Sequence, residues 1–493
     1  MLLLAACLLA AAPKRPRLVV AIVIDQFRYD YLEHYRAEFR GGLRRMLSWG
    51  AVFSNANYIA FPTVTSVGHS TFLSGAMPSV SGIVGNDWYD REEHRQVPSV
   101  SDRGVAMLGA AGEGASPHRL LVSTVGDELK MAGGSHVIAV SLKDRSAILM
   151  AGHAADAAYW FDPASGNFVT SSYYRKALPP WVEEFDAGHP VARFRGRTWL
   201  GHTLPHDAGL SDAVEASPFG NELLEEFAER ALAAERLGTR DIPDLLAISF
   251  SSNDFVGHQS GPFSPEERAV TLETDRVLEK LLNAIDRQVG LDNTLIVLTG
   301  DHGVAPSAAQ DAAHRMPGGN IPVDAVRKAV QAALARAYGP GDWIDGSSDL
   351  GLYLNQDLIA RKKLDPAAVC RAAAAAAFGV PHIFRVYTRD QLAAGAVTGD
   401  ALSRRVENGF HLRRSADLEF IPDPYWMIST AAAMHGSPFS YDSHVPVIFM
   451  GPGIKAGRYD ESITVNDVAP TLAAILEVET PSGSVGRVLN EMW

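Results

Sequence analysis

Five apolar, β-branched runs separated by helix-like segments constrain the fold of this chain more than any other feature. Continuous runs of this kind are typical of strands buried on both faces of a sheet. They occupy residues 17–25 (RLVVAIVID), 136–142, 244–250, 293–299 and 445–451. Helix-like segments occupy residues 123–133, 220–238, 265–290 and 465–478. Strands that alternate with helices predict an α/β fold of three layers, with a mostly parallel sheet covered on both faces.

The length of the chain is large for one compact core. Its 493 residues favour one large α/β domain with insertions, or two domains. We expect a single domain over residues 13–493, with insertions around 87–135 and around 305–430, where a smaller cap region is predicted beside the main sheet. The net charge of −13 argues against nucleic acid or an anionic membrane as a main partner.

The first twelve residues resemble a secretory leader. They are apolar, end in small residues and are too short to span a bilayer, although no positive segment precedes them. The sequence LAAC at residues 4–7 also fits a lipobox, in which case Cys7 would carry a lipid anchor. Cys7 and Cys370 cannot form a disulfide framework. We therefore expect an exported protein, periplasmic or at the outer surface.

Acidic residues and histidines recur where the predicted strands end. Ligands bind at the carboxyl ends of strands in open α/β sheets. One aspartate after a strand is more often a turn residue, but a set on three or four neighbouring strands indicates a site. Carboxylates and imidazoles together are ligands of zinc, and this set is large enough for two ions. The set is Asp25, Asp254, His258, Asp301, His302, His435 and His444.

The stretch FPTVTSVGHSTFLSG at residues 61–75 has two possible interpretations. Serine and threonine are common where a helix begins, so the stretch could be an ordinary helix start. It could also present one of its hydroxyl groups for catalysis. The stretch alone does not decide between the two.

Several motifs together are similar to the alkaline phosphatase superfamily. They are VVAIVID, FPTVTSVGHSTFLSGAMPSVSGIVGN, NDFVGH, TGDHG, HGSP and VAPTLAAIL, and they occur in this order between about residues 17 and 490. The resemblance is to the type I phosphodiesterase/nucleotide pyrophosphatase family, in particular its PafA-like bacterial alkaline phosphatases. It implies an alkaline-phosphatase-like fold and two Zn²⁺ ions per chain.

The resemblance also implies a role for individual residues. One zinc would be held by Asp254, His258 and His435, with His444 as an alternative to His435. The other would be held by Asp25, Asp301 and His302, together with the nucleophile. Thr65 would be that nucleophile and form a phosphothreonine intermediate, and Asn86 would donate to a phosphoryl oxygen.

The neighbours of Thr65 fit supporting roles. Thr63 and Ser66 are better interpreted as capping or support residues, and His69 as structural. A helix beginning at Thr65 would place its hydroxyl group where exposed N–H groups favour negative charge.

Lys143 and Arg145 favour a phosphate monoester as the substrate. They follow the predicted strand at 136–142, and in extended geometry residues i and i+2 point the same way. PafA-like phosphatases carry such a pair against the transferred phosphate, and the related diesterases lack it. A monoester dianion has a third unsubstituted oxygen that these two cations can bind, whereas a diester has none to spare.

The sequence leaves several alternatives to a phosphate monoesterase. A phosphodiesterase or nucleotide pyrophosphatase is the alternative within the same family. A sulfatase would need a C-x-P-x-R-type sequence, which is absent around Cys370, and a phosphoglycerate-mutase-like enzyme would use serine. A zinc-binding protein without activity is the alternative outside enzymes. The sequence does not distinguish a monomer from a dimer.

Overall fold

Five parallel strands form the centre of the main sheet, in the computed structural model that describes residues 15–493. In spatial order they are β13 (Thr294–Gly300), β1 (Leu18–Ile24), β12 (Asp244–Phe250), β7 (Val137–Ser141) and β8 (Ala157–Asp162). β1 pairs in parallel with both β12 and β13, so Ile24 has Phe250 on one side and Gly300 on the other. This register brings the carboxyl ends of the three strands to one level of the sheet edge.

Antiparallel strands extend the sheet on both sides of this centre. β20 (His444–Met450) pairs with β13, and β2 (Ala51–Asn57) pairs with β20. β9 (Asn167–Ser171) pairs with β8 and is followed by β5 (Ser101–Leu108) and β6 (Glu113–Ala115). The apolar run at 445–451 is therefore a core strand, but it runs against its neighbour, because the chain returns to the sheet at its carboxyl edge.

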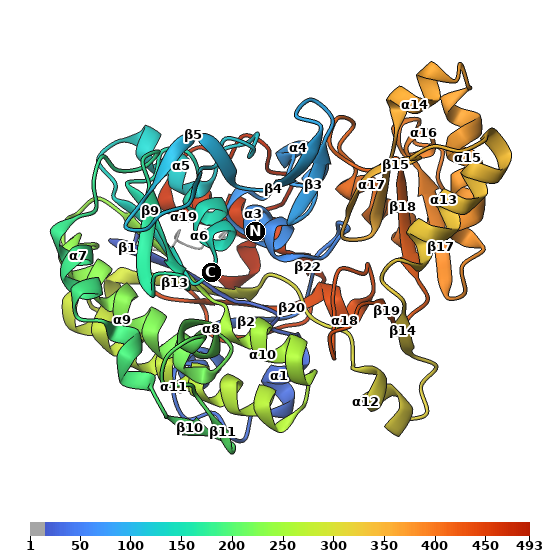
Figure 1. The fold of residues 1–493 in the computed structure, drawn as a ribbon. Coiled ribbons are helices and arrows are strands. Elements are labelled where there is room, and N and C mark those ends of the chain that lie inside the picture. The colour runs from blue at the N-terminus through green and yellow to red at the C-terminus, as the bar shows by residue number, and fades with distance from the viewer. Residues whose placement is uncertain (1–14) are drawn as a thin grey trace, which may run out of the picture.

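Helices cover both faces of the sheet and make three layers (Figure 1). Along β1, Val19, Ala21 and Val23 pack into one hydrophobic core, and the alternate residues pack into another. The first core contains side chains of α3 (Thr65–Ser74), α5 (Val125–Ala132), α6 (Asp144–Ala151) and α19 (Val468–Leu476). The second contains those of α1 (Tyr29–His34), α2 (Gly42–Trp49), α9 (Pro218–Ala234) and α11 (Pro265–Gln288).

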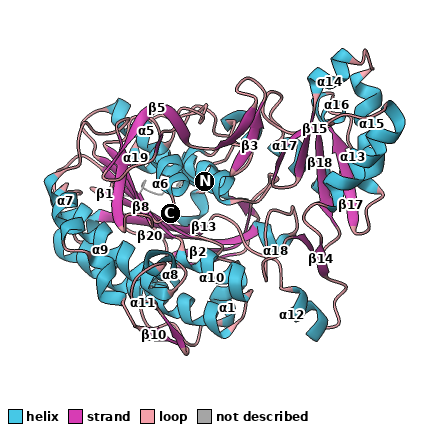
Figure 2. Ribbon diagram, viewed as in Figure 1, coloured by secondary structure: helices cyan, strands magenta, loops and turns pink. Residues whose placement is uncertain are grey.

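A second, four-stranded sheet lies beside the main body (Figure 2). Its strands, in order, are β15 (Ile344–Ser348), β16 (Gly351–Leu354), β18 (Leu418–Pro422) and β17 (Ile383–Thr388). Helices α13 (Ala325–Tyr338), α14 (Gln356–Arg361), α15 (Pro366–Phe378), α16 (Arg389–Ala393) and α17 (Ala401–Gly409) accompany it. This cap has its own hydrophobic core, built around Trp343 and Phe420.

The remaining elements connect these parts. They are α4 (Pro78–Ser81), the hairpin β3 (Asp87–Asp90) and β4 (Arg95–Pro98), α7 (Pro180–Ala187), β10 (Thr198–Trp199) and β11 (His202–Thr203), α8 (Leu210–Glu215), α10 (Ser252–Ser260), α12 (Ala308–Ala313), β14 (Gly319–Ile321), β19 (Trp426–Ile428), α18 (Ser440–Ser443), β21 (Gly457–Tyr459) and β22 (Ile463–Thr464). Four short 3-10 helices lie at Pro190–Phe194, Leu291–Asn293, Val465–Asp467 and Asn490–Met492. The division of the chain into one domain with insertions stays a prediction.

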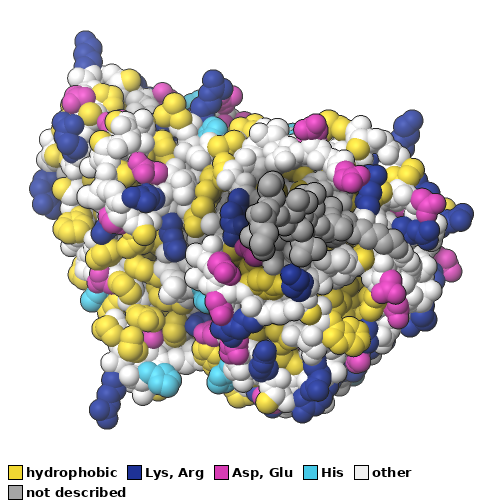
Figure 3. All heavy atoms as spheres, turned by 180° about the vertical axis from the view of Figure 1, so that it is seen from behind, with side chains coloured by type: hydrophobic (Ala, Val, Ile, Leu, Met, Phe, Trp, Pro, Cys, Tyr) yellow, Lys and Arg dark blue, Asp and Glu magenta, His cyan; other side chains and the backbone are white. Residues whose placement is uncertain are grey.

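The leader expected at residues 1–12, with Cys7, lies outside the described residues. Among residues 15–493, no helix has the length and apolarity needed to cross a membrane. Cys370 is buried as a free thiol. On the face shown in Figure 3, basic and acidic side chains are interspersed.

Candidate active site

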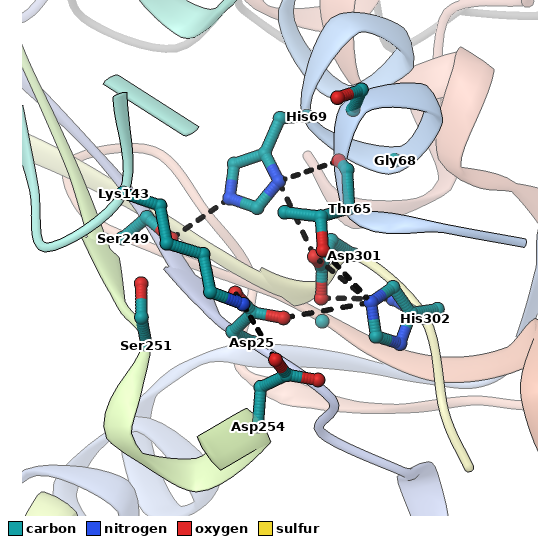
Figure 4. A network of polar contacts seen from close by, with 12 residues as sticks. Asp25, Thr65, Gly68, His69, Lys143, Ser249, Ser251, Asp254, Asp301 and His302 are labelled. Carbon is teal, nitrogen blue, oxygen red and sulfur yellow. Dashed lines mark hydrogen bonds and ion pairs between the residues drawn. The ribbon is translucent and has the colours of Figure 1, made fainter. Parts of the chain in front are cut away.

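Thr65 is the first residue of helix α3, which is the condition under which its hydroxyl group would lie at a helix N-terminus. Val64 precedes it in an extended conformation, and the Thr65 side chain is buried with its Oγ1 3.5 Å from His302 Nε2. The helix approaches the sheet closely, because a Cβ atom on Gly68 would lie 2.2 Å from the Asp301 carbonyl oxygen. The stretch at 61–75 is thus a helix start that also presents a hydroxyl group to the carboxylates at the strand ends (Figure 4).

Three buried aspartates meet at these strand ends. Asp25 follows β1, Asp301 follows β13, and Asp254 lies in the first turn of α10, after β12. Two groups of side chains have ligand atoms within 4.8 Å of one another: Asp25, Asp301 and His302 form the first, and Asp254, His302 and His435 form the second. The first group is the expected one.

The second group differs in one member from the expected set. His302 takes the place of His258 in this group. The His258 Nε2 lies 3.1 Å from Asp254 Oδ1, but His258 is not among the residues whose ligand atoms all lie within 4.8 Å of one another. The His302 ring stacks on the His435 ring, with centroids 3.5 Å apart, and so lies between the two groups. His258 remains adjacent, with its ring centroid 5.1 Å from that of His435.

Each of the three histidines hydrogen-bonds a backbone carbonyl through Nδ1. The acceptors are Gly303 for His302, Ala433 for His258 and Thr63 for His435, all at 2.9 Å. A donating Nδ1–H leaves the Nε2 lone pair free, which is the usual way proteins orient metal-binding histidines. Thr63, a rival for the nucleophile, is engaged instead through Oγ1, which donates to the Ser437 carbonyl at 2.7 Å.

His444 lies away from both groups. Its Nε2 is 2.9 Å from the Ser54 carbonyl oxygen, and its ring stacks on Tyr29 with centroids 4.7 Å apart. Between the two candidates for the last ligand, the structure therefore places only His435 beside the aspartates.

Burial lowers the pKa of His302. Burial, together with the neighbouring imidazoles of His302 and His258, lowers the pKa of His435 well below its usual range. Burial and the nearby Asp301 carboxylate raise the pKa of Asp25. Neutral imidazoles beside carboxylates form a donor set that suits a divalent cation.

Lys143 forms ion pairs with one aspartate of each group. Its Nζ lies 2.6 Å from Asp25 Oδ2 and 2.6 Å from Asp254 Oδ2, and its side chain is buried. Burial opposes the charge of Lys143, but these two carboxylates outweigh burial and raise its pKa. For Asp254, the charges of His258 and Lys143 outweigh burial and lower its pKa.

Arg145 does not extend parallel to Lys143, so the extended geometry expected for the pair is wrong. Lys143 is the extended residue before helix α6, but Arg145 lies within the first turn of that helix. Helix α6 begins at Asp144, so the backbone from Lys143 to Arg145 is not extended, although the charge of Arg145 still acts on Lys143. Arg145 is partly exposed, with its Nη1 3.9 Å from Asp144 Oδ1, whereas Lys143 is drawn onto the buried carboxylates.

Asn86 is anchored to the start of helix α3. Its Oδ1 accepts a hydrogen bond from the Ser66 backbone N–H at 2.9 Å. This orients the amide and leaves its Nδ2 group, a donor, for another partner. The Ser66 hydroxyl group contacts Ser99 Oγ at 2.8 Å, so Ser66 has the supporting position expected of it.

Two further residues support the site. Gln26, which the sequence did not reveal, donates its backbone N–H to Asp301 Oδ1 at 3.0 Å and its Nε2 to Asp254 Oδ1 at 2.7 Å. Its only signal was its place directly after Asp25. His69, interpreted as structural, contacts the Thr65 carbonyl oxygen and Ser249 Oγ at 2.8 Å each (Figure 4).

The donor set fits divalent metal ions. Asp25 Oδ1 and Asp301 Oδ2 are buried, and histidine ring nitrogens face them. His302 Nε2 lies 3.5 Å from Asp25 Oδ1 and 3.3 Å from Asp301 Oδ2, and His69 Nδ1 lies 3.3 Å from Asp301 Oδ2. Buried carboxylate oxygens are costly in a protein interior unless a cation or a donor compensates them, and a neutral His302 that donates through Nδ1 offers only a lone pair at Nε2. Asp25, Asp301 and His302 could hold one ion, and Asp254, His258 and His435, with His302 at the boundary, could hold a second.

Comparison with known proteins identifies the family of this chain. Residues 19–444 match the family described as type I phosphodiesterase / nucleotide pyrophosphatase. The chain is 34% identical to alkaline phosphatase PafA of Elizabethkingia meningoseptica, over 98% of this chain and 95% of that protein. It is 35% identical to alkaline phosphatase PhoV of Synechococcus elongatus, over 97% of this chain and 93% of that protein.

Solved structures give the same result. The crystal structure of wild-type PafA superposes with a TM-score of 0.92 at 34% identity, and covers 98% of this chain and 99% of that chain. Murine ectonucleotide pyrophosphatase / phosphodiesterase 5 shares the fold, with a TM-score of 0.59 at 16% identity over 94% of this chain and 95% of that chain.

The chain belongs to the type I phosphodiesterase/nucleotide pyrophosphatase family and has an alkaline-phosphatase-like α/β fold. Both the resemblance found in its motifs and the predicted fold class are confirmed. Its relatives place it among the phosphoester hydrolases.

Proposed function

We propose that this protein is a two-zinc alkaline phosphatase that hydrolyses phosphate monoesters, with Thr65 as the nucleophile. The observation that carries the proposal is the convergence of the Thr65 hydroxyl group, two groups of metal-binding side chains and Lys143 at one edge of the sheet. Its similarity to PafA and PhoV supports alkaline phosphatase activity.

Thr65 acts as the attacking group in this proposal. A hydroxyl at a helix N-terminus faces unpaired backbone N–H groups, which favour negative charge on the oxygen. When bound, zinc would supply the larger part of this activation and would offset charge on the attacking and leaving oxygens. Attack of Thr65 Oγ1 on phosphorus forms a phosphothreonine and releases the alcohol, and water then hydrolyses that ester.

The polar groups around Thr65 bind the transferred phosphate. Asn86 presents its Nδ2 group beside the helix start, and Lys143 carries a positive charge between the aspartates. Arg145, the second residue of α6, is a second cation whose charge acts on Lys143. Fixed donors and charges of this kind stabilise the charge that develops in phosphoryl transfer. A diester has one unsubstituted oxygen fewer for these groups to bind.

The phosphothreonine itself provides the direct test. We expect acid quenching of the zinc-loaded protein during turnover of p-nitrophenyl phosphate to trap phosphate on the peptide that contains Thr65, located by mass spectrometry. Thr65→Ala should trap no phosphate and lose activity by about 10³-fold or more. Ser66→Ala, the matched control, should keep the label. Label on Ser66 or Thr63 would contradict the assignment.

The expected export is also a proposal. Cleavage after the leader, or a lipid on Cys7, would place the enzyme where phosphate esters are met outside the cytoplasm. Mass spectrometry of the amino terminus of the protein isolated from its host would separate the two.

A further inference from the structure

A crevice of about 100 Å³ lies between the cap and the catalytic core, next to His435. The cap contributes Asp349, Leu350 and Pro422, the connecting strand β19 adds part of the wall, and the core contributes His435 and Asp442. Since a water molecule takes about 30 Å³ in the liquid, the crevice has room for a short organic group. Its walls on the cap side are largely apolar.

Two carboxylates give this crevice a negative character. Asp442 is 1% exposed; its Oδ2 accepts hydrogen bonds from the Ser437 backbone N–H and hydroxyl group, but its Oδ1 has no partner among the described residues. The Asp349 side chain is exposed to solvent, but enough protein lies around its carboxylate for burial to raise its pKa. The described lining residues include neither lysine nor arginine, but Arg28 acts on Asp442 and Arg145 on Asp349 from outside the lining and offset part of the two charges. A partner with positive charge would therefore be favoured there.

The crevice begins at the groups that would bind the phosphate. His435 belongs to the second metal-binding group, on one side. On the other side, the Asn86 backbone N–H donates to the Asp349 carboxylate, which also feels the charge of Arg145. A phosphate bound between Thr65, Asn86 and Arg145 would thus have the opening of the crevice beside it, and its ester oxygen could direct the alcohol into it.

We propose that this crevice is the leaving-group subsite, and that it selects phosphate monoesters of short alcohols that carry a positive charge, such as aminoalkyl groups. The inference rests on the proposed phosphatase function and adds the substrate class to it. The apolar wall accommodates the carbon chain, and the two carboxylates attract a cation and repel an anion.

The carboxylates are ionised at the alkaline pH of the assay. Burial and the neighbouring Asp87 raise the pKa of Asp349 to about 6, and burial raises that of Asp442 to about 7. At pH 9 both side chains therefore carry their charge.

Three phosphate monoesters of small alcohols differ in the charge of the alcohol: 2-aminoethyl phosphate, ethyl phosphate and carboxymethyl phosphate. The measured quantity is the ratio of kcat/KM for the aminoethyl ester to that for the carboxymethyl ester, at pH 9 with zinc-loaded protein. Because the same two esters are used for every protein, dividing the ratio of a variant by that of wild type removes the difference in their intrinsic reactivity. We expect Asp349→Asn and Asp442→Asn each to lower this ratio by about five- to tenfold, with ethyl phosphate changed much less.

The matched control is Asp345→Asn, which removes an exposed carboxylate of strand β15 that does not line the crevice. It should leave the ratio unchanged. Equal ratios in wild type and both crevice variants, or an equal fall in Asp345→Asn, would overturn the subsite. If Asp442→Asn does not fold, the ratio measured for Asp349→Asn, a change at an exposed residue, tests the subsite alone. If wild type hydrolyses none of the three esters and no p-nitrophenyl phosphate, the proposed phosphatase function itself fails.

Discussion

Gln26 links the two candidate metal-binding groups. Its backbone N–H holds Asp301 in one group and its Nε2 holds Asp254 in the other, while its own backbone has a φ of 62°. Residues held in this left-handed conformation carry strain that is maintained at functional sites. The side chain is buried, and Gly257 leaves room for it, because a Cβ atom there would lie 1.9 Å from Gln26 Oε1.

Replacement of Gln26 by methionine should weaken metal binding. Gln26→Met keeps the size and flexibility of the side chain but removes the hydrogen bond to Asp254, and loss of such a supporting contact typically costs about 10- to 100-fold in metal affinity. Zinc bound per chain at buffered free zinc concentrations would measure this directly. The control is Gln259→Met, an exposed glutamine of α10. Equal zinc affinity in Gln26→Met and wild type would show that Gln26 does not position Asp254.

At the scale of the element, the packing of α3 on the loop after β13 fixes where Thr65 lies. Gly68 meets the backbone of Asp301 directly. Gly68→Ala should therefore push the helix away, lower stability by about 1–3 kcal/mol and reduce kcat/KM by about 10²-fold, since a shift of about 1 Å is enough for such a loss. Urea unfolding and steady-state kinetics measure both effects.

Gly399→Ala is the matched control for this change. A Cβ atom there would have no neighbour within 4 Å, and the residue has no positive φ, so stability and kcat/KM should both stay close to wild type. A Gly68→Ala variant that behaves like this control would mean that α3 can move without displacing Thr65.

At the scale of the whole molecule, buried acids make stability depend on pH. Glu225 of α9 is 2% exposed, and its Oε1 has no hydrogen-bond partner among the described residues. Burial raises its pKa from 4.5 to about 7. Between these two values the unfolded chain has lost the proton that the folded protein keeps, so stability is full below pH 4.5 and falls as pH rises to about 7.

Glu225→Gln should remove this loss of stability between pH 4.5 and about 7. Relative to wild type, we expect the variant to gain about 3 kcal/mol in free energy of unfolding between pH 4 and pH 8, because a shift of one pKa unit corresponds to about 1.4 kcal/mol. Urea unfolding at the two pH values measures the difference. Glu229→Gln, a more exposed glutamate of the same helix that pairs with Arg287, should show no such gain. A pH profile parallel to wild type in Glu225→Gln would contradict the assignment.

The sequence predicts those features that depend on local pattern. The central strands β1, β12 and β13 are runs rich in leucine, isoleucine and valine, so their burial and the positions of Asp25 and Asp301 at the ends of β1 and β13 could be inferred. The start of α3 at Thr65 follows from a proline and a run of small polar residues. Strand β8, which contains Tyr159 and Trp160, lacks such a run and was not anticipated.

Features that depend on tertiary contacts could not be read in the same way. The direction of β20 depends on where the cap returns the chain to the sheet. The different backbone conformations of Lys143 and Arg145 depend on the helix that begins at Asp144. The role of Gln26 depends on two carboxylates more than 200 positions away in sequence. The crevice beside Asp349 exists only where cap and core meet.

The preference for monoesters over diesters tests the central claim most directly. The measurement is kcat/KM of the zinc-loaded protein on p-nitrophenyl phosphate and on its methyl ester, with Lys143→Ala and Arg145→Ala alongside wild type. We predict that the monoester is favoured by orders of magnitude in wild type and that this preference collapses in the variants. A preference for the diester, or a ratio unchanged in both variants, would contradict the account and assign the protein to the phosphodiesterases of its family.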